Sequence, residues 1–154
     1  MQRVPTVRVA SASEYPRIAA AYDAWGYHGG VSPGDTIYIA ECGSGLIAAV
    51  RRTHEHGLVL LRGMYVAPEH QRRGVGAQLL EFFVSHLHGM SCYCVPYSHL
   101  QAFYGRAGFA PLTQELVPAF LPERVASYRA RGLDVLVMRR LAATPETERP
   151  NQIR

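Results

Sequence analysis

Apolar residues recur along the chain with two different spacings. In residues 13–25, Ile18, Tyr22 and Trp25 lie three or four positions apart, which predicts a helix with one apolar face. Ser13 at its start is a residue type that caps helices. In residues 133–141, Leu136 and Met138 alternate with their neighbours, which predicts a strand. Residues 58–66 are apolar almost throughout, and such a run is typical of a central strand.

Turn-forming residues separate these segments. The tripeptide Gly43-Ser44-Gly45 indicates a tight hairpin, and residues 53–57 indicate a second turn. The pattern therefore predicts a mixed α/β layer fold in a single domain over residues 1–141, followed by a polar, disordered tail over residues 142–154. In chain order, the expected elements are strand 4–9, helix 13–25, strands 36–42, 46–52 and 58–66, helix 75–88, strand 91–95, helices 98–106 and 121–131, and strand 133–141.

Composition narrows the class of protein. With 154 residues, 48% hydrophobic and 18% charged, the chain is suited to a globular domain rather than a disordered or fibrous one. Its three cysteines, Cys42, Cys92 and Cys94, are an odd number, which disfavours a disulfide framework and favours a reducing compartment. No apolar run has the length of a signal peptide core or of a membrane span. We therefore expect a cytoplasmic protein without a membrane partner.

The charge of the chain is carried in an unusual way. The formal net charge is +4, and none of the 16 basic residues is lysine. Guanidinium groups donate paired hydrogen bonds to phosphate, so this balance suits an anionic ligand such as a nucleotide cofactor. It would also suit nucleic acid, but the arginines are scattered rather than gathered in one stripe. No nucleic-acid partner is therefore predicted.

The segment 64–76 combines the end of a strand with the start of a helix. A proline stops the strand at Pro68, a polar loop follows, and Gly74 and Gly76 open the helix. Unpaired amides at a helix start attract anions, and glycines let a phosphate approach the backbone closely. Arg72 and Arg73 add positive charge beside these amides. The arrangement predicts a site for a pyrophosphate.

The kind of pyrophosphate follows from the spacing. A P-loop requires a lysine, which the chain lacks, and a dinucleotide fingerprint requires a third glycine where Leu79 stands. The pattern Gln71-x-x-Gly74-x-Gly76 instead resembles the acetyl-CoA loop of the GNAT superfamily of N-acetyltransferases. Farther along, Tyr104-x-x-x-Gly108-Phe109 resembles a second segment of that superfamily. The resemblance extends over about residues 58–109, roughly a third of the chain.

This resemblance implies a fold and an activity. The expected fold is a twisted, mostly antiparallel sheet that splays at the cofactor site and carries helices on both faces. The expected activity is direct transfer of an acetyl group from acetyl-CoA to the primary amine of a small molecule or peptide. The alternative is a CoA-binding sensor without turnover. Members of the superfamily are often homodimers, so a homodimer is a further expectation.

The resemblance also assigns residues to the cofactor. Tyr104 matches the tyrosine that protonates the departing CoA thiolate, and an ordinary tyrosine pKa near 10 would suit that role. The pantetheine arm would pair with the strand, and the pyrophosphate would meet the loop amides. The implied cofactor residues are Met64, Tyr65 and Val66 on the strand, and Gln71, Arg72, Arg73, Gly74, Val75, Gly76 and Ala77 on the loop and helix.

The chain departs from the family pattern at two places. Tyr97 stands where many members carry an asparagine that touches the cofactor. The neighbouring Ser98 is expected either to take over that contact or to cap the helix. In addition, residues 58–66 contain no carboxylate, so the general base is left open. Ordered water could accept the proton, and the weaker candidates are Glu41, Cys94 and His99.

The acceptor site is expected around the first helix and the loop after it. An aromatic wall with a polar tip, suited to a small apolar or aromatic amine, would be formed by Tyr22, Trp25, Tyr27 and His28. The alternative is that Tyr22 and Trp25 simply pack on the sheet. Arg62 is a charge within an apolar strand and demands a partner. That partner is either a carboxylate of the acceptor or Glu41.

Two shorter patterns are interpreted as structural. The tripeptide His54-Glu55-His56 lies in a turn and lacks further ligands, so no metal site is predicted. Cys92 and Cys94 share one face of a strand and are expected to be small buried residues.

Overall fold

The structure is a computed structural model that describes residues 4–142. Apart from Ala142, the predicted tail lies outside the described residues. The chain divides into two compact units, one ending at His86 and the other beginning at Leu87. The expectation of a single domain over residues 1–141 stays a prediction.

The first unit is an antiparallel sheet with two helices. Its strands follow one another in the order β1, β2, β3, β4, and each pairs antiparallel with the next. The pairing of β2, β3 and β4 follows from hairpin turns, since adjacent segments joined by short turns pair in antiparallel fashion, whereas β1 is separated from β2 by a helix. The elements are β1 (Thr6–Val9), a 3₁₀ turn (Ala12–Glu14), α1 (Tyr15–Trp25), β2 (Thr36–Cys42), β3 (Gly45–Glu55), β4 (Leu58–Val66), a second 3₁₀ turn (Pro68–His70) and α2 (Val75–Ser85).

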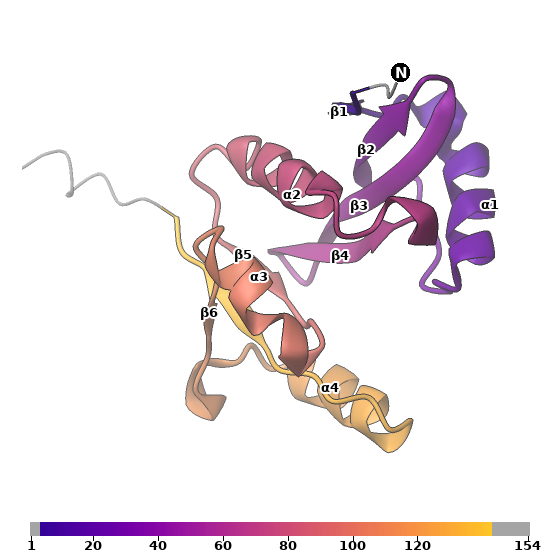
Figure 1. The fold of residues 1–154 in the computed structure, drawn as a ribbon. Helices are drawn as coiled ribbons and strands as arrows, with labels where there is room; N and C mark the ends of the chain where they lie inside the picture. Colours follow the sequence, from indigo (N-terminus) through magenta and orange to yellow (C-terminus); the bar gives the residue numbers. More distant parts are fainter. Residues whose placement is uncertain (1–3, 143–154) are drawn as a thin grey trace, which may run out of the picture. The chain divides into compact units, whose positions relative to one another are not determined.

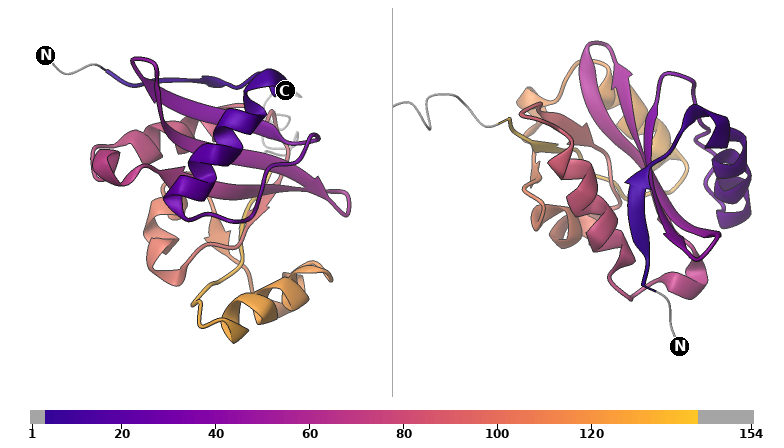
Figure 2. Two further views of the ribbon diagram at one scale, coloured as in Figure 1. Left: turned by 90° about the vertical axis from the view of Figure 1, so that its right-hand side faces the viewer. Right: turned by 90° about the horizontal axis from the view of Figure 1, so that it is seen from above.

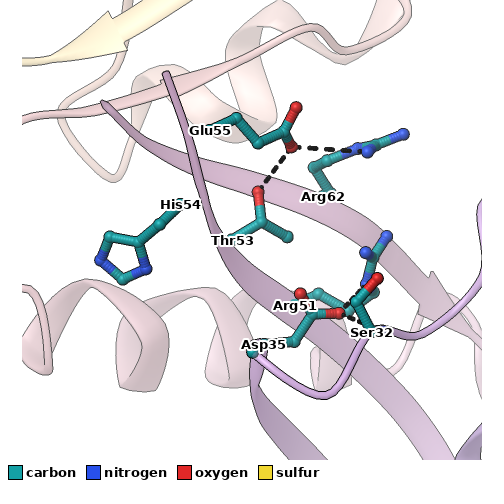
Figure 3. Close-up of a pocket in the computed structure, with 8 residues that line it drawn as sticks. Ser32, Asp35, Arg51, Thr53, His54, Glu55 and Arg62 are labelled. Atoms are coloured by element: carbon teal, nitrogen blue, oxygen red, sulfur yellow. Dashed lines mark hydrogen bonds and ion pairs between the residues drawn. The ribbon is translucent and has the colours of Figure 1, made fainter. Parts of the chain in front are cut away.

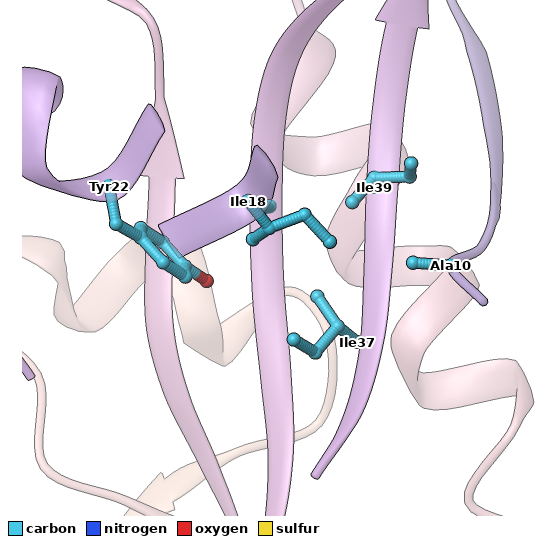
Figure 4. Packing of buried hydrophobic residues seen from close by; sticks show 6 residues of the cluster. Ala10, Ile18, Tyr22, Ile37 and Ile39 are labelled. Carbon is cyan, nitrogen blue, oxygen red and sulfur yellow. The ribbon is translucent and has the colours of Figure 1, made fainter. Parts of the chain in front are cut away.

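Helices α1 and α2 cover opposite faces of this sheet (Figures 1 and 2). Side chains alternate along β2, so Ile37 and Ile39 face α1. They pack with Ile18 and Tyr22 of the helix in a fully buried cluster (Figure 4). The intervening Tyr38 faces α2 and contacts the ring of Phe83 at 5.5 Å between centroids. Each face of the sheet therefore has an apolar core of its own.

The second unit is a smaller antiparallel sheet with its own helices. Its strand order is β5, β7, β6, and an isolated bridge joins Tyr97 to Val135. A glycine with positive φ, Gly132, follows its last helix and ends it. The elements are β5 (Cys92–Cys94), a 3₁₀ turn (Ser98–Leu100), α3 (Gln101–Gly105), β6 (Ala110–Pro111), a 3₁₀ turn (Gln114–Leu116), α4 (Leu121–Ala130) and β7 (Met138–Arg140).

The mixed α/β class with a mostly antiparallel sheet is confirmed, and several element boundaries are corrected. The side chain of Ser13 bonds Ser11 and caps no helix, because α1 starts two residues later, after a 3₁₀ turn. The third strand continues to Glu55, and the helix after the loop ends at Ser85 instead of residue 88. The last strand is confined to Met138–Arg140, the stretch that pairs with both β5 and β6. Pairing partners therefore decide where these elements end.

Candidate functional site

A β-bulge interrupts the pairing of β3 with β4. Ala49 pairs with Tyr65 and Arg51 pairs with Arg62, so one residue of β3 lies opposite two residues of β4. One of these two is Gly63, whose φ of 65° lies in the left-handed region. A glycine in this conformation is typical of such bulges, because other residues adopt it only with strain. The other of the two residues is Met64, which is the first residue of the segment predicted to pair with the pantetheine arm.

The bulge decides which side chains share a face of the sheet. Arg62 and Tyr65 are three residues apart and would point to opposite faces in a regular strand. Their partners on β3 are two residues apart, so the bulge brings both side chains to the same face. Tyr65 packs against the cluster under α1, which identifies this face as the one that α1 covers.

Tyrosines from α1 and the following loop surround the bulge. The hydroxyl of Tyr22 donates to the carbonyl of Gly63 at 2.7 Å. A Cβ atom at Gly63 would lie 3.0 Å from that hydroxyl and 3.1 Å from the ring of Tyr27. The ring of Tyr27 packs against Tyr22 at 4.6 Å and against Tyr65 at 5.3 Å. Burial raises the pKa of Tyr22, so its hydroxyl keeps the proton that it donates.

The predicted acceptor residues separate into two groups. Trp25 is half-buried and meets Tyr22 edge-on at 6.1 Å, so with Tyr27 it belongs to the aromatic packing beside the bulge. The side chain of His28 is 78% exposed and lies 3.7 Å from Asp23, which is equally exposed. His28 therefore lies apart from this packing.

A polar cavity of about 300 Å³ opens beside the bulge. Thr53 and Glu55 point into it from β3, and the intervening His54 points to the opposite side of the strand (Figure 3). Arg62 reaches the carboxylate of Glu55 from β4, with 3.4 Å between Nη1 and Oε2. The complete lining is Ser32, Gly34, Asp35, Arg51, Thr53, His54, Glu55 and Arg62.

A buried ion pair forms the floor of this cavity. The side chains of Arg51 and Asp35 are 3% and 4% exposed, and Nε donates to Oδ2 at 2.8 Å. The same carboxylate accepts the backbone N–H of Ser32 at 2.9 Å, and Nη1 of Arg51 donates to the hydroxyl of Tyr27 at 2.6 Å. A buried charge is tolerated when it is paired and hydrogen-bonded in this way. The pair ties the loop after α1 to β3.

Arg62 does not pair with Glu41, so that expected alternative is wrong. Glu41 accepts from Arg8 at 2.9 Å and from Arg17 at 3.1 Å, far along the sheet from the bulge. The side chain of Arg62 is 26% exposed and faces the cavity together with Glu55. The other alternative, a carboxylate of the acceptor, is compatible with this position.

The predicted pyrophosphate loop leads from β4 to α2. The side-chain amide of Gln71 donates to the carbonyl of Val66 at 3.0 Å and closes the loop onto the end of the strand. Arg72 and Gly74 both have positive φ, 64° and 82°. Left-handed residues near a helix start turn successive amides toward one point, which suits an anion. Residues 71–74 are exposed.

The start of α2 supplies further donors. Its first intrahelical bond runs from Gln78 to the carbonyl of Gly74 at 3.0 Å, so the amides of Val75, Gly76 and Ala77 have no partner within the helix. Val75 is 3% exposed and anchors this helix end in the core. The loop thus exposes hydrogen-bond donors, while the buried Val75 holds the start of the helix in place.

The second unit holds the two remaining predicted residues. Tyr104 is 4% exposed, and its ring meets Phe109 edge-on at 5.9 Å. Burial, with a smaller effect of Cys94, raises the pKa of Tyr104, so the expected value near 10 is wrong for this side chain. The hydroxyl of Ser98 donates to Asp134 at 2.8 Å and caps no helix. A cofactor contact of Ser98 stays a prediction.

Two of the three side chains named as weaker candidates for the general base, Glu41 and Cys94, are poor bases. Arg8 lowers the pKa of Glu41, whose carboxylate is held by two arginines. Burial raises the pKa of the Cys94 thiol, which disfavours the thiolate. His99 is exposed and stacks on Tyr97 at 5.7 Å. Within residues 4–142, no group of three His, Cys, Asp or Glu is arranged to hold a metal, and no helix is long and apolar enough to cross a membrane.

Sequence reasoning missed Asp35, Arg51, Glu55 and the role of Gly63. A glycine inside a strand pattern is a signal for a bulge, and Gly63 carries that signal. Arg51 likewise follows an apolar run, as Arg62 does. Asp35 and Glu55 carry no comparable signal, because they lie in turn-like segments where carboxylates are common.

Comparison with known proteins supplies the family. The family model described as "Acetyltransferase (GNAT) domain" matches residues 33–111, just over half of the chain. No curated protein sequence matches the chain.

Solved structures share the fold at low sequence identity. The ribosomal-protein-S18-alanine N-acetyltransferase from Escherichia coli is 14% identical, with a TM-score of 0.66 over 92% of this chain and 96% of that one. Rv2747 from Mycobacterium tuberculosis, in complex with CoA and NLQ, is 14% identical, with a TM-score of 0.67 over 90% and 99%. N-acetylglutamate synthase from Neisseria gonorrhoeae, complexed with coenzyme A and N-acetyl-glutamate, is 17% identical, with a TM-score of 0.66 over 94% of this chain and 36% of that one.

Proposed function

The chain belongs to the acetyltransferase (GNAT) family, and on that premise we propose that it moves an acetyl group from acetyl-CoA to the primary amine of an acceptor bound beside the β4 bulge. Acetyl-CoA is its acyl donor. The observation that carries the proposal is the bulge itself, which lies next to a cavity and precedes the loop predicted to bind a pyrophosphate.

The donor site extends from the bulge to the start of α2. The pyrophosphate of CoA would accept from the loop amides, and the pantetheine arm would run along Met64, Tyr65 and Val66. An extended ligand can add to a strand through backbone hydrogen bonds. A bulge leaves part of the strand ladder unpaired, and such backbone groups can stabilise charge on an acyl oxygen. The carbonyl of Gly63 is already held by Tyr22, which keeps the bulge in one conformation.

The chemical step requires two proton movements. The amine nitrogen attacks the acyl carbon, the carbon–nitrogen bond forms and the carbon–sulfur bond breaks. One proton leaves the nitrogen, and one reaches the CoA sulfur. We assign the second proton to Tyr104 on its sequence motif. Burial raises the pKa of Tyr104, which makes its hydroxyl a weaker acid than an ordinary tyrosine, so the assignment rests on the motif alone.

Two measurements test the proposed function. Acetyl-CoA at millimolar concentration should raise the melting temperature, because a ligand that binds only the folded state stabilises it. Release of the CoA thiol should then accelerate with at least one member of a panel of amino acids, peptides and polyamines. Stabilisation without acceleration by any amine would favour the sensor alternative. Absence of both effects would overturn the proposal.

A further inference from the structure

The arginine side chains that line the cavity beside the bulge have more N–H donors than the described part of the chain has acceptors placed to bond them. A guanidinium has five N–H donors. Arg51 uses Nε for Asp35 and one N–H of Nη1 for Tyr27, and its Nη2 has no partner among residues 4–142. Arg51 lines the cavity, so these donors are available to a molecule bound there. A guanidinium with unused donors at a cavity is suited to a ligand that accepts hydrogen bonds.

Arg62 adds donors to the same cavity. Its only ion pair within the described residues is the 3.4 Å contact with Glu55, which is longer than a strong charge-assisted hydrogen bond. The carboxylate of Glu55 also accepts from Thr53 at 2.8 Å. The acidic groups of the cavity are therefore already engaged, while both guanidiniums retain donors. The unused donors of the cavity are therefore suited to an anion.

We propose that this cavity binds a carboxylate of the acceptor, and that the acceptor is a small amino acid or another amine with a carboxylate a few bonds from the reacting nitrogen. This inference rests on the proposed function. Arg62 and Arg51 would hold the carboxylate, since a planar guanidinium fork matches a planar carboxylate. Arg62 directly precedes the bulge, so a short acceptor held there has its amine close to the proposed acyl position.

Charge and size favour a carboxylate over a phosphate. The lining contains two arginines and two carboxylates, so its formal charge is zero when His54 is neutral. A zwitterion leaves that charge unchanged, whereas a dianionic phosphate on an amine would leave an excess of negative charge in a partly buried site. A volume of about 300 Å³ lies at the small end of ligand pockets, which fits a single amino acid.

Matched acceptor pairs test the inference. Each amino acid is compared with its primary amide, which keeps the amine and the side chain but loses the negative charge. With the wild-type protein, kcat/KM should be at least about 10-fold higher for the acid, as expected for charge-assisted hydrogen bonds. Arg62→Gln should lower kcat/KM for the acid roughly 10- to 100-fold and leave the amide nearly unchanged. Arg62→Lys should give an intermediate loss, because it keeps the charge without the fork.

Two controls make the outcomes separable. Arg131→Gln removes an exposed arginine of the second unit and should leave kcat/KM unchanged for both the acid and the amide. An N-acetyl amino acid should raise the melting temperature of the wild type more than its amide does, and this difference should vanish in Arg62→Gln. Acceleration by acids and amides alike, a preference for phosphate-bearing amines, or an equal loss for both substrates in Arg62→Gln would overturn the inference while the acyltransferase function stands. Failure of every amine would instead count against the proposed function.

Discussion

Substitutions at Gly74 test the pyrophosphate loop most directly. Its φ is 82°, and an added Cβ would meet no atom within 4 Å. Both Gly74→Ala and Gly74→Asp therefore avoid a clash and pay mainly the backbone cost of a left-handed residue, about 1–2 kcal/mol. The two variants should lose similar stability. For CoA binding they differ chiefly in charge, since the aspartate places a carboxylate where we expect the phosphates to bind.

The size of that difference follows from electrostatics. Two unit charges about 4 Å apart interact with about 1 kcal/mol in water and about 4 kcal/mol at an effective dielectric constant of 20. The loop is exposed, so the lower part of this range applies. A penalty of about 1–2 kcal/mol corresponds to binding roughly 5- to 30-fold weaker for Gly74→Asp than for Gly74→Ala.

Calorimetric titration with CoA at low and high salt measures this difference. Salt screens exposed charges, so the excess loss in Gly74→Asp should shrink at high ionic strength, and the loss shared with Gly74→Ala should persist. A pantetheine fragment without phosphates should not distinguish the two variants. Equal affinity of both variants for CoA at low salt would refute the assignment of the pyrophosphate to this helix start.

Three further predictions concern the acid, the bulge and pH. Tyr104→Phe should leave CoA affinity nearly unchanged and lower kcat roughly 10²- to 10⁴-fold, and unchanged single-turnover kinetics would show that the ring only packs. Gly63→Ala should lower the unfolding free energy in denaturant titrations by about 2–4 kcal/mol, because strain adds to overpacking, whereas Gly57→Ala, which has positive φ but open space, should cost about 1–2 kcal/mol. Equal losses in the two glycine variants would contradict the packing argument. Arg8 lowers the pKa values of Glu14 and Glu41, so their contribution to stability should be complete above the ordinary value of 4.5 and fall at lower pH. The stability of the wild type and of Glu41→Gln, measured as pH falls, should differ in this window. Parallel curves would show that the Glu41 carboxylate does not contribute to the pH dependence.

Local signals predicted much of the first unit. The expected strands 36–42 and 58–66 coincide with β2 and β4, because each has apolar character between turn residues. The loop between β4 and α2 was also predictable, since a proline, two glycines and two arginines lie within a few residues of one another, and its binding of a pyrophosphate stays a prediction. Boundaries in the second unit were predicted less well. Its strands of two or three residues are defined by their partners more than by their own composition.

The sequence by itself therefore determined the class of the fold and the family, and it predicted the loop for an anionic cofactor. Only the tertiary structure decided what surrounds Arg62. A strand has a period of two, and nothing in the spacing from Arg62 to Tyr65 says where a bulge shifts that period. The partner Glu55 comes from the neighbouring strand, and the Asp35–Arg51 pair joins a loop to β3 across 16 positions. Such contacts depend on register and on chain closure in space, which a linear pattern of polar and apolar residues does not encode.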